Sequence, residues 1–138
     1  MKDDKFKMVF SDRESMYEIV TGWQVAHGWT KMPIDVFPPI GAFGVWEDRL
    51  ACAVFAYECQ GTSIAWMDWM VTNPEIGIRA ASAMKRLCQA FSDYLIGKGA
   101  TNVVTCCRQE SLGRVLHKSG FDKTDENVTH YVKTGGKK

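Results

Sequence analysis

Apolar residues change their spacing once near the middle of the chain, where a strand pattern gives way to a helix pattern. Residues 63–71 are apolar nearly throughout and include two tryptophans, which is typical of a strand buried on both faces. Pro74 then interrupts the pattern, because proline cannot donate a ladder hydrogen bond. From Arg79 onward, three- and four-residue spacings predict a long helix with one buried stripe, formed by Ala80, Ala83, Met84, Leu87, Phe91, Tyr94 and Leu95.

The junction between this strand and this helix is a candidate anion site. The first turn of a helix leaves backbone N–H groups unpaired, with the positive end of the helix dipole behind them. Gly77, Ala80, Ala81 and Ser82 carry side chains too small to block a phosphate. We therefore expect a phosphate-bearing ligand at the start of the helix.

The first forty residues predict a strand, a helix and an apolar loop. Residues 6–10 have the pattern of a short strand, and Ser11 and Glu14 have the spacing of a capping box for a helix over residues 12–27. Residues 29–40 hold three of the four prolines among large apolar side chains. A loop of this composition is expected to pack against the core or to line a cleft.

Two further strands precede the central junction. Residues 42–46 and 50–58 flank a turn at Glu47 and Asp48, which predicts an antiparallel pair. Residues 50–58 are apolar almost without a break, so this strand should be central in the sheet.

The C-terminal part completes a mixed sheet. Residues 102–107 should pair in parallel with residues 63–71, because a helical crossover joins parallel strands. A short helix over residues 109–118 and an edge strand over residues 128–132 follow. The predicted order is β-α-β-β-β-α-β-α-β, an α/β fold with helices on both faces of a mixed sheet.

Length and composition indicate one globular domain. We expect the domain to span residues 1–134 of the 138, with residues 135–138 as a flexible tail. The formal net charge of +1 gives no electrostatic reason to expect nucleic acid or an anionic membrane as partner. An oligomer is compatible with this composition.

The N-terminal residues and the cysteines lead us to expect a cytoplasmic location. The chain begins MKDDKFK, unlike a signal peptide, and no apolar run reaches the roughly 18 residues of a spanning helix. The five cysteines are odd in number and lack a CxxC spacing, which favours reduced thiols in a cytoplasmic protein. Because Cys106 and Cys107 should point to opposite faces of a strand, a metal pair is not expected. His117 and His130 have no partner at ligand spacing and are assigned no metal.

Three local motifs carry a resemblance to a known family. Residues 68–71 (Asp-Trp-Met-Val) precede Pro-Glu at 74–75, residues 77–82 form a small-residue loop, and residues 115–121 end in Lys-Ser-Gly-Phe. Together with the element order, they resemble the GNAT superfamily of acyl-CoA-dependent N-acetyltransferases. The Pro-Pro-Ile-Gly run at 38–41 and the Trp-rich strand are similar to small GNAT-like proteins of bacteriophages, which would place the chain in a host cytoplasm.

The resemblance implies transfer of an acetyl group from acetyl-CoA, as co-substrate, to a small-molecule or peptide amine. In the family, pantetheine lies between two separated strands, backbone N–H groups of the first strand meet the thioester carbonyl, and the next helix receives the pyrophosphate. Asp68, or a water molecule beside it, is then the candidate catalytic base. The cofactor-binding residues implied by motif position are Met70, Val71, Gly77, Ile78, Arg79, Ala80, Ala81, Ser82 and Gln109.

Departures from the family pattern leave a second function open. The two expected glycines of the loop are Ala80 and Ser82, and Gly77 occupies the Arg/Gln position. Leu116 replaces the tyrosine that often protonates the leaving thiolate, and Tyr131 is the nearest spare phenol in the sequence. The alternative is a GNAT-fold protein that has lost its chemistry and serves as a binding or structural component, such as part of a phage particle.

Single residues also carry alternatives. Asp68 is either the base or an acid at a solvent-facing cleft edge or paired with an arginine, and Arg79 is either a phosphate ligand or a surface cation. Trp66 and Trp69 should lie on opposite faces of their strand and pack in the core. His27 falls in the last turn of the first helix, where the helix dipole favours a partly cationic imidazole, so we expect this structural role in place of catalysis.

Overall fold

The computed structural model describes residues 5–107, 110–125, 128, 129, 131, 133 and 135. Its centre is a five-stranded sheet in which the spatial order follows the chain order. The first four strands are antiparallel neighbours, and the fourth and fifth are parallel. The strands are β1 (Phe6–Asp12), β2 (Ile40–Trp46), β3 (Arg49–Glu58), β4 (Ile64–Thr72) and β5 (Asn102–Val104). Both the central position of β3 and the parallel pairing of β4 with β5 are confirmed.

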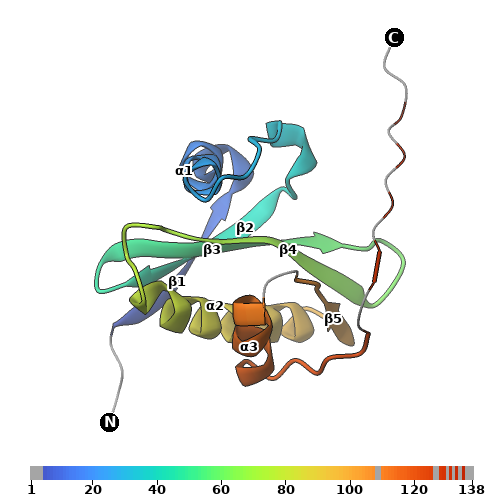
Figure 1. The fold of residues 1–138 in the computed structure, drawn as a ribbon. Coiled ribbons are helices and arrows are strands. Elements are labelled where there is room, and N and C mark those ends of the chain that lie inside the picture. Colours follow the sequence, from blue (N-terminus) through green and yellow to red (C-terminus); the bar gives the residue numbers. More distant parts are fainter. Residues whose placement is uncertain are drawn as a thin grey trace.

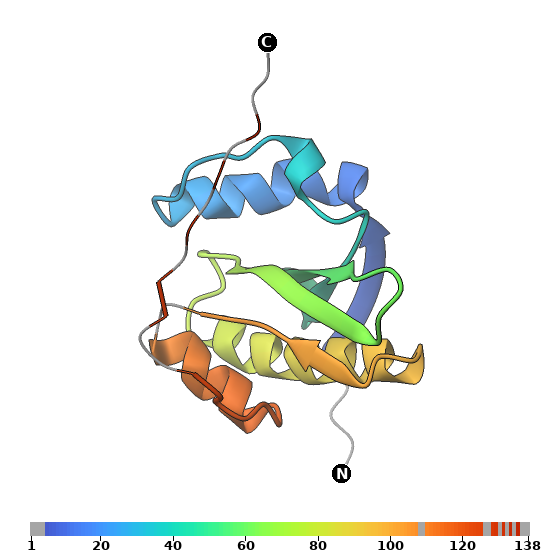
Figure 2. The ribbon, with the colours of Figure 1, turned by 90° about the vertical axis from the view of Figure 1, so that its right-hand side faces the viewer.

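Helices cover both faces of the sheet, as predicted (Figure 1). One face carries α1 (Arg13–Ala26) and the short 3-10 helix η1 (Ile34–Val36). The other face carries α2 (Arg79–Gly97) and α3 (Glu110–Lys118). Figure 2 shows the same three layers from the side, with the sheet between α1 and the α2–α3 pair. The molecule is therefore a mixed α/β fold.

The start of α1 differs from the predicted capping box. β1 continues to Asp12, and Asp12 is the N-cap, since its side chain accepts a hydrogen bond from the backbone N–H of Ser15 at 2.8 Å. The capping box of Ser11 and Glu14 was therefore wrong by one residue. An aspartate and a serine are equally good caps, so the pattern did not distinguish them.

Two apolar cores hold the layers together. The buried core between the sheet and α2 is mainly aliphatic and sulfur-containing, with Phe91 as its one buried aromatic ring among the described residues, whereas the core between the sheet and α1 is rich in aromatic rings. Phe37 and Pro38 of the proline-rich loop are fully buried in the α1 layer. The prediction that residues 29–40 pack down is therefore confirmed at these two positions.

The C-terminal part departs most from the prediction. β5 ends at Val104, three residues before its predicted end at Cys107. Val128, Thr129 and Tyr131 are not in a strand, which makes the predicted edge strand over residues 128–132 wrong at these positions. His130 and Val132 lie outside the described residues. A short alternating apolar stretch without a buried face has little to fix it in a sheet.

Candidate active site

β4 and β5 are paired at one end and separate at the other. The parallel ladder joins residues 64–66 to residues 102–104 and then stops, although β4 continues to Thr72. The hydroxyl of Thr105 still donates to the carbonyl oxygen of Met67 at 2.9 Å. Beyond that bond, the described residues supply no strand along this edge of β4. We call residues 67–72 the open end of β4 and residues 64–66 its closed end. Figure 2 shows β4 and the chain that continues from β5 moving apart toward the open end.

A β-bulge interrupts the open end. Ala53 of β3 pairs with Val71 and Phe55 pairs with Asp68, so one residue of β3 faces two of β4. Trp69, one of those two, has a φ of 58°. This left-handed conformation costs on the order of 1 kcal/mol or more for a residue with a bulky side chain. A bulge changes the direction of the backbone of its strand. Here the change occurs in the part of β4 that is no longer paired with β5.

The side chain of Trp69 holds the bulge in place. Its ring centroid lies 4.7 Å from that of Phe37, and its Nε1–H donates to the hydroxyl of Tyr57 at 2.8 Å. That hydroxyl donates in turn to the carbonyl oxygen of Val36 at 2.8 Å. Trp66 pairs in register with Tyr57, so the two tryptophans share one face of the sheet. The prediction of opposite faces was wrong, because the extra residue of the bulge breaks the alternation.

Asp68 pairs with Phe55 directly before the bulge and is half-buried. One of its carboxylate oxygens accepts the backbone N–H of Trp69 at 2.8 Å. The carboxylate also lies close enough to Cys106 to act on that thiol. The pKa of Cys106 is raised, first by partial desolvation and then by the negative charge of Asp68. Asp68 therefore faces the separation between β4 and the segment after β5.

Met70 and Val71 turn their side chains into the two cores. Met70 is buried in the α2 layer, where the thiol of Cys88 lies 3.7 Å from its sulfur, and Val71 is buried in the α1 layer. Their side chains are thus occupied by packing. Only their backbone groups can meet a ligand, as the family resemblance implies.

The loop after β4 is a fixed turn. The side-chain amide of Asn73 donates to the carbonyl oxygen of Leu50 at 2.9 Å, and its oxygen accepts the backbone N–H of Glu75. Gly77 has a φ of 76°, a conformation that side chains rarely allow. The positive φ of the loop is therefore at Gly77. Ala80 and Ser82, at the positions where the family has glycine, lie within α2.

The N-terminus of α2 has no side-chain cap. Ile78 is the N-cap residue and makes no capping hydrogen bond, and the first turn contains no acidic residue. Ile78 is 89% exposed, and Ala81 and Ser82 are also exposed. The partial positive charge at this end of the helix therefore faces solvent, because Ile78 does not cap it and the side chains of Ala81 and Ser82 are too small to cover it. In the chain, this helix end follows the open end of β4 after the loop of residues 73–77.

Two predicted cofactor residues, Ala80 and Arg79, have side chains that do not face a phosphate at the start of α2. Ala80 is only 4% exposed and packs into the core, so its side chain cannot face a phosphate. Arg79 points toward the β2–β3 turn, where its guanidinium pairs with Glu47 at 3.2 Å. Gln109 lies outside the described residues.

The sequence raised two positions, 116 and 131, for the proton donor. Leu116 is 6% exposed and belongs to the α2 core, so a tyrosine there would have to displace core side chains. Tyr131 is 90% exposed. The sequence did not reveal one contact of this region, between the ring of His27 and Thr72, because the two residues are 45 positions apart.

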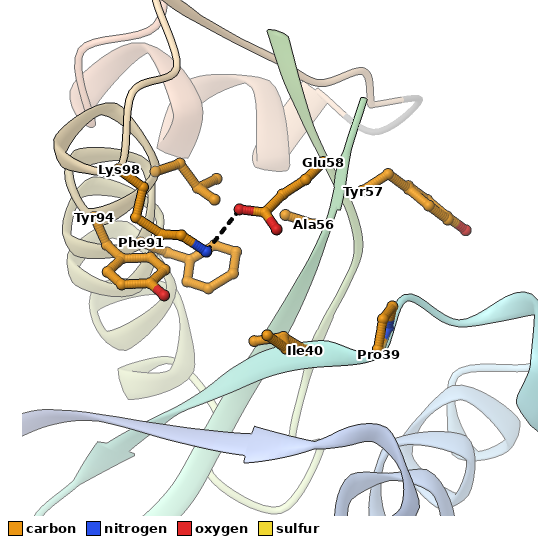
Figure 3. A pocket seen from close by; sticks show the side chains of 9 residues that line it. Pro39, Ile40, Ala56, Tyr57, Glu58, Phe91, Tyr94 and Lys98 are labelled. Atoms are coloured by element: carbon orange, nitrogen blue, oxygen red, sulfur yellow. Dashed lines mark ion pairs between the residues drawn. The ribbon is translucent and has the colours of Figure 1, made fainter. Parts of the chain in front are cut away.

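A pocket of about 210 Å³ lies near the closed end, away from the predicted residues. Figure 3 shows Ile40, Phe91 and Tyr94 along its wall, with Lys98 and Glu58 pointing toward each other. Their ion pair measures 2.8 Å, and the hydrogen bond to Glu58 raises the pKa of Lys98. The two charges of this pocket therefore satisfy each other.

Two other kinds of site were searched for in the described part of the chain. No helix there is long and apolar enough to cross a membrane. The same residues contain no group of three or more His, Cys, Asp or Glu side chains placed to hold a metal ion.

Known structures match this fold over nearly the whole chain, although no protein-family model and no curated protein sequence matches it significantly. A crystal structure described as a probable acetyltransferase is 12% identical, with a TM-score of 0.67 over 95% of this chain and 99% of that one. The aminoglycoside N-acetyltransferase AAC(6')-Iy, in complex with CoA, is 12% identical, with a TM-score of 0.64 over 96% and 98%.

A third match binds an aminoglycoside. It is an aminoglycoside acetyltransferase from an uncultured soil metagenomic sample, in complex with sisomicin, at 12% identity and a TM-score of 0.64 over 96% of this chain and 97% of that one. At these identities the likeness shows the fold alone. The chain has the fold of the GNAT acetyltransferases.

Proposed function

We propose that this protein is an N-acetyltransferase that moves an acetyl group from acetyl-CoA to a small amine in the cytoplasm. The observation that carries the proposal is the coincidence of two features at one place. β4 loses its parallel neighbour at its open end, and the loop of residues 73–77 leads from there to the uncapped N-terminus of α2. One feature suits an extended chain that bonds to backbone, and the other suits a phosphate. Structures with this fold have been solved with CoA bound.

In this proposal acetyl-CoA runs along the free edge of β4. Backbone groups of Met70 and Val71 flank the thioester, because the ladder with β5 stops at Trp66 and leaves this edge of β4 open. Residues 77–82 receive the pyrophosphate at the start of α2. Arg79 needs to leave only an exposed ion pair with Glu47 to reach a phosphate, and such pairs contribute little stability. Gln109 remains a candidate contact to the cofactor by motif position.

Acetyl transfer requires a deprotonated amine as nucleophile and a stable leaving group. Asp68 is the acidic residue of the open end and remains the candidate base from the sequence. A thiol titrates near 8.5, so CoA thiolate can leave near neutral pH with water as the proton source. With Leu116 in the core, we propose a slow enzyme that relies on positioning more than on acid catalysis.

Acetyl-CoA binding is the first test. At a free concentration one hundred times its dissociation constant, a ligand stabilises the folded state by about 2.7 kcal/mol, and thermal unfolding should show this shift. Ser82→Glu should weaken binding roughly tenfold or more, because its carboxylate opposes the pyrophosphate. An acid in the first turns of a helix does not harm the fold. Gln89→Glu, at an exposed position farther along α2, is the matched control and should bind as the unmodified protein does.

The second candidate is a GNAT-fold binding or structural protein without chemistry, such as a phage particle component. Three observations favour this candidate: Leu116 lies in the core, Arg79 is paired with Glu47, and positions 80 and 82 carry no glycine. This candidate predicts that acetyl-CoA does not change the unfolding temperature of the protein or of its Ser82→Glu variant.

A further inference from the structure

His27 connects the end of α1 to the open end of β4. It is the C-cap residue of α1, and its backbone N–H bonds to the carbonyl oxygen of Trp23 at 3.0 Å. Its ring Nε2 lies 2.9 Å from the carbonyl oxygen of Thr72, the last residue of β4. The hydroxyl oxygen of Thr72 lies 3.3 Å from the same nitrogen. The imidazole therefore sits against the part of β4 where the thioester is expected.

The hydrogen bond to Thr72 fixes which ring nitrogen carries the proton. A carbonyl oxygen only accepts hydrogen bonds, so Nε2 must be protonated to make this bond. In neutral imidazole one nitrogen is a donor and the other an acceptor. Neutral His27 is therefore the Nε2–H tautomer, and its Nδ1 holds a lone pair that can take a proton.

The ring is held in one orientation and remains accessible. It stacks on Trp29, with centroids 5.4 Å apart and planes 29° apart, and the backbone N–H of Trp29 bonds to the carbonyl oxygen of Gln24 at 2.9 Å. Both His27 and Trp29 are exposed. The C-terminal end of α1 is a favourable place for the positive charge of an imidazolium ion. The face of Trp29 can also attract the ammonium group of an arriving amine.

Asp68 is less suited than His27 to remove a proton from a substrate. One of its oxygens already accepts the backbone N–H of Trp69 within the bulge. Glu75, in the loop that follows Thr72, pairs with Arg49, and Lys31, which follows Trp29 in the chain, pairs with Glu18.

We propose that His27 is the proton acceptor for the attacking amine and that Trp29 forms the wall of the amine subsite; this inference rests on the proposed acetyl transfer. Nδ1 of His27 takes one proton from the substrate ammonium. The free amine forms a C–N bond to the thioester carbonyl, and the C–S bond breaks. The amine loses a second proton, one proton ends on the CoA thiolate, and the other leaves to solvent. The products are the N-acetyl amine and CoA, and Asp68 acts by positioning the bulge.

The tautomer can be tested without any substrate. Nitrogen-15 chemical shifts of the histidine rings distinguish the two neutral tautomers, and His27→Gln assigns the signal. We expect His27 to be the Nε2–H tautomer. The opposite tautomer, with Nδ1 protonated, would overturn the inference because the remaining lone pair would face Thr72.

Three variants separate the chemical role from a structural one. His27→Gln keeps an amide N–H that can donate to Thr72 but has no group that takes a proton, whereas His27→Ala removes both. The exposed His117 of α3 supplies the control His117→Ala. CoA release is measured with acetyl-CoA and either sisomicin or butylamine as the acceptor, together with acetyl-CoA affinity.

We expect His27→Gln and His27→Ala to lose turnover equally, by roughly one hundredfold, with acetyl-CoA affinity and the control unchanged. Added imidazole should restore part of the activity of His27→Ala. Normal turnover in His27→Gln would overturn the inference and leave His27 a structural link. Acetyl-CoA binding without CoA release by the unmodified protein would overturn it too. Absence of acetyl-CoA binding would instead overturn the proposed function.

Discussion

The two ends of β4 use one strand for different purposes. At the closed end, β4 has a neighbour on both sides, and the nearby pocket is bounded by the ion pair of Lys98 with Glu58. At the open end, one neighbour is gone, a bulge changes the strand direction, and the uncapped start of α2 lies next to it. The pocket thus lies near the closed end, where Lys98 and Glu58 already pair with each other. The backbone and helix groups that can bind an anionic ligand lie at the other end.

Removing the support of the bulge should affect the open end most. Trp69→Ala removes the ring contact with Phe37 and the bond to Tyr57, and should lower the free energy of unfolding by about 2–4 kcal/mol. Trp69→Phe keeps a ring and loses only the hydrogen bond, at a cost of about 1 kcal/mol. Chemical denaturation measures both.

The same pair tests the function of the bulge. Trp69→Ala at a temperature where it is folded should bind acetyl-CoA more weakly than Trp69→Phe does. Equal acetyl-CoA affinity in both variants would show that the bulge does not shape the ligand site.

Two exposed cysteines report on the two ends separately. Cys106 follows β5, and the charge of Asp68 at the open end contributes to its raised pKa, whereas Cys59 lies in the turn that leads into the closed end. Acetyl-CoA at ten times its dissociation constant should slow alkylation of Cys106 about tenfold by occupying the site, and should leave Cys59 unaffected. Mass spectrometry of the alkylated peptides measures both rates.

The raised pKa of Cys106 makes a related prediction. Its thiolate fraction at neutral pH is below that of an ordinary thiol, so its alkylation should be slow and should speed up as the pH rises. Asp68→Asn removes one cause of the raised pKa and should speed the reaction at fixed pH. Cys52 and Cys88 should not react in the folded protein, because burial raises the pKa of both thiols, that of Cys88 to about 12.

Arg79 should show the smallest effect. Arg79→Gln breaks the exposed pair with Glu47, which should change the free energy of unfolding by less than about 1 kcal/mol. Acetyl-CoA affinity should fall by roughly fivefold, since one charge near the pyrophosphate is lost. An unchanged affinity would make Arg79 a surface cation.

The sequence predicted the strands and helices well where the apolar pattern was long. β3, β4 and α2 each bury a continuous face, so their period was readable, and the parallel partner of β4 followed from the crossover. The bulge at Trp69 was not predictable from the pattern, because residues 63–71 are apolar on both faces and an added residue leaves no break. The early end of β5 also has no local signal.

The candidate site was only partly predictable. Motif positions led to the start of α2, but not to the burial of Ala80 or the pairing of Arg79, which depend on how the helix lies on the sheet. The meeting of His27 with Thr72 depends on the packing of α1 across β4. No spacing rule connects residues that distant in sequence.

The central claim is that acetyl-CoA binds at the open end of β4, and an NMR titration tests it most directly. Backbone amide signals of nitrogen-15-labelled protein are followed as acetyl-CoA is added. We expect the largest shifts at Met70, Val71 and residues 77–82, with small shifts at Tyr94, Leu95 and Lys98 around the pocket. The largest shifts around that pocket, or none anywhere at millimolar acetyl-CoA, would contradict the account.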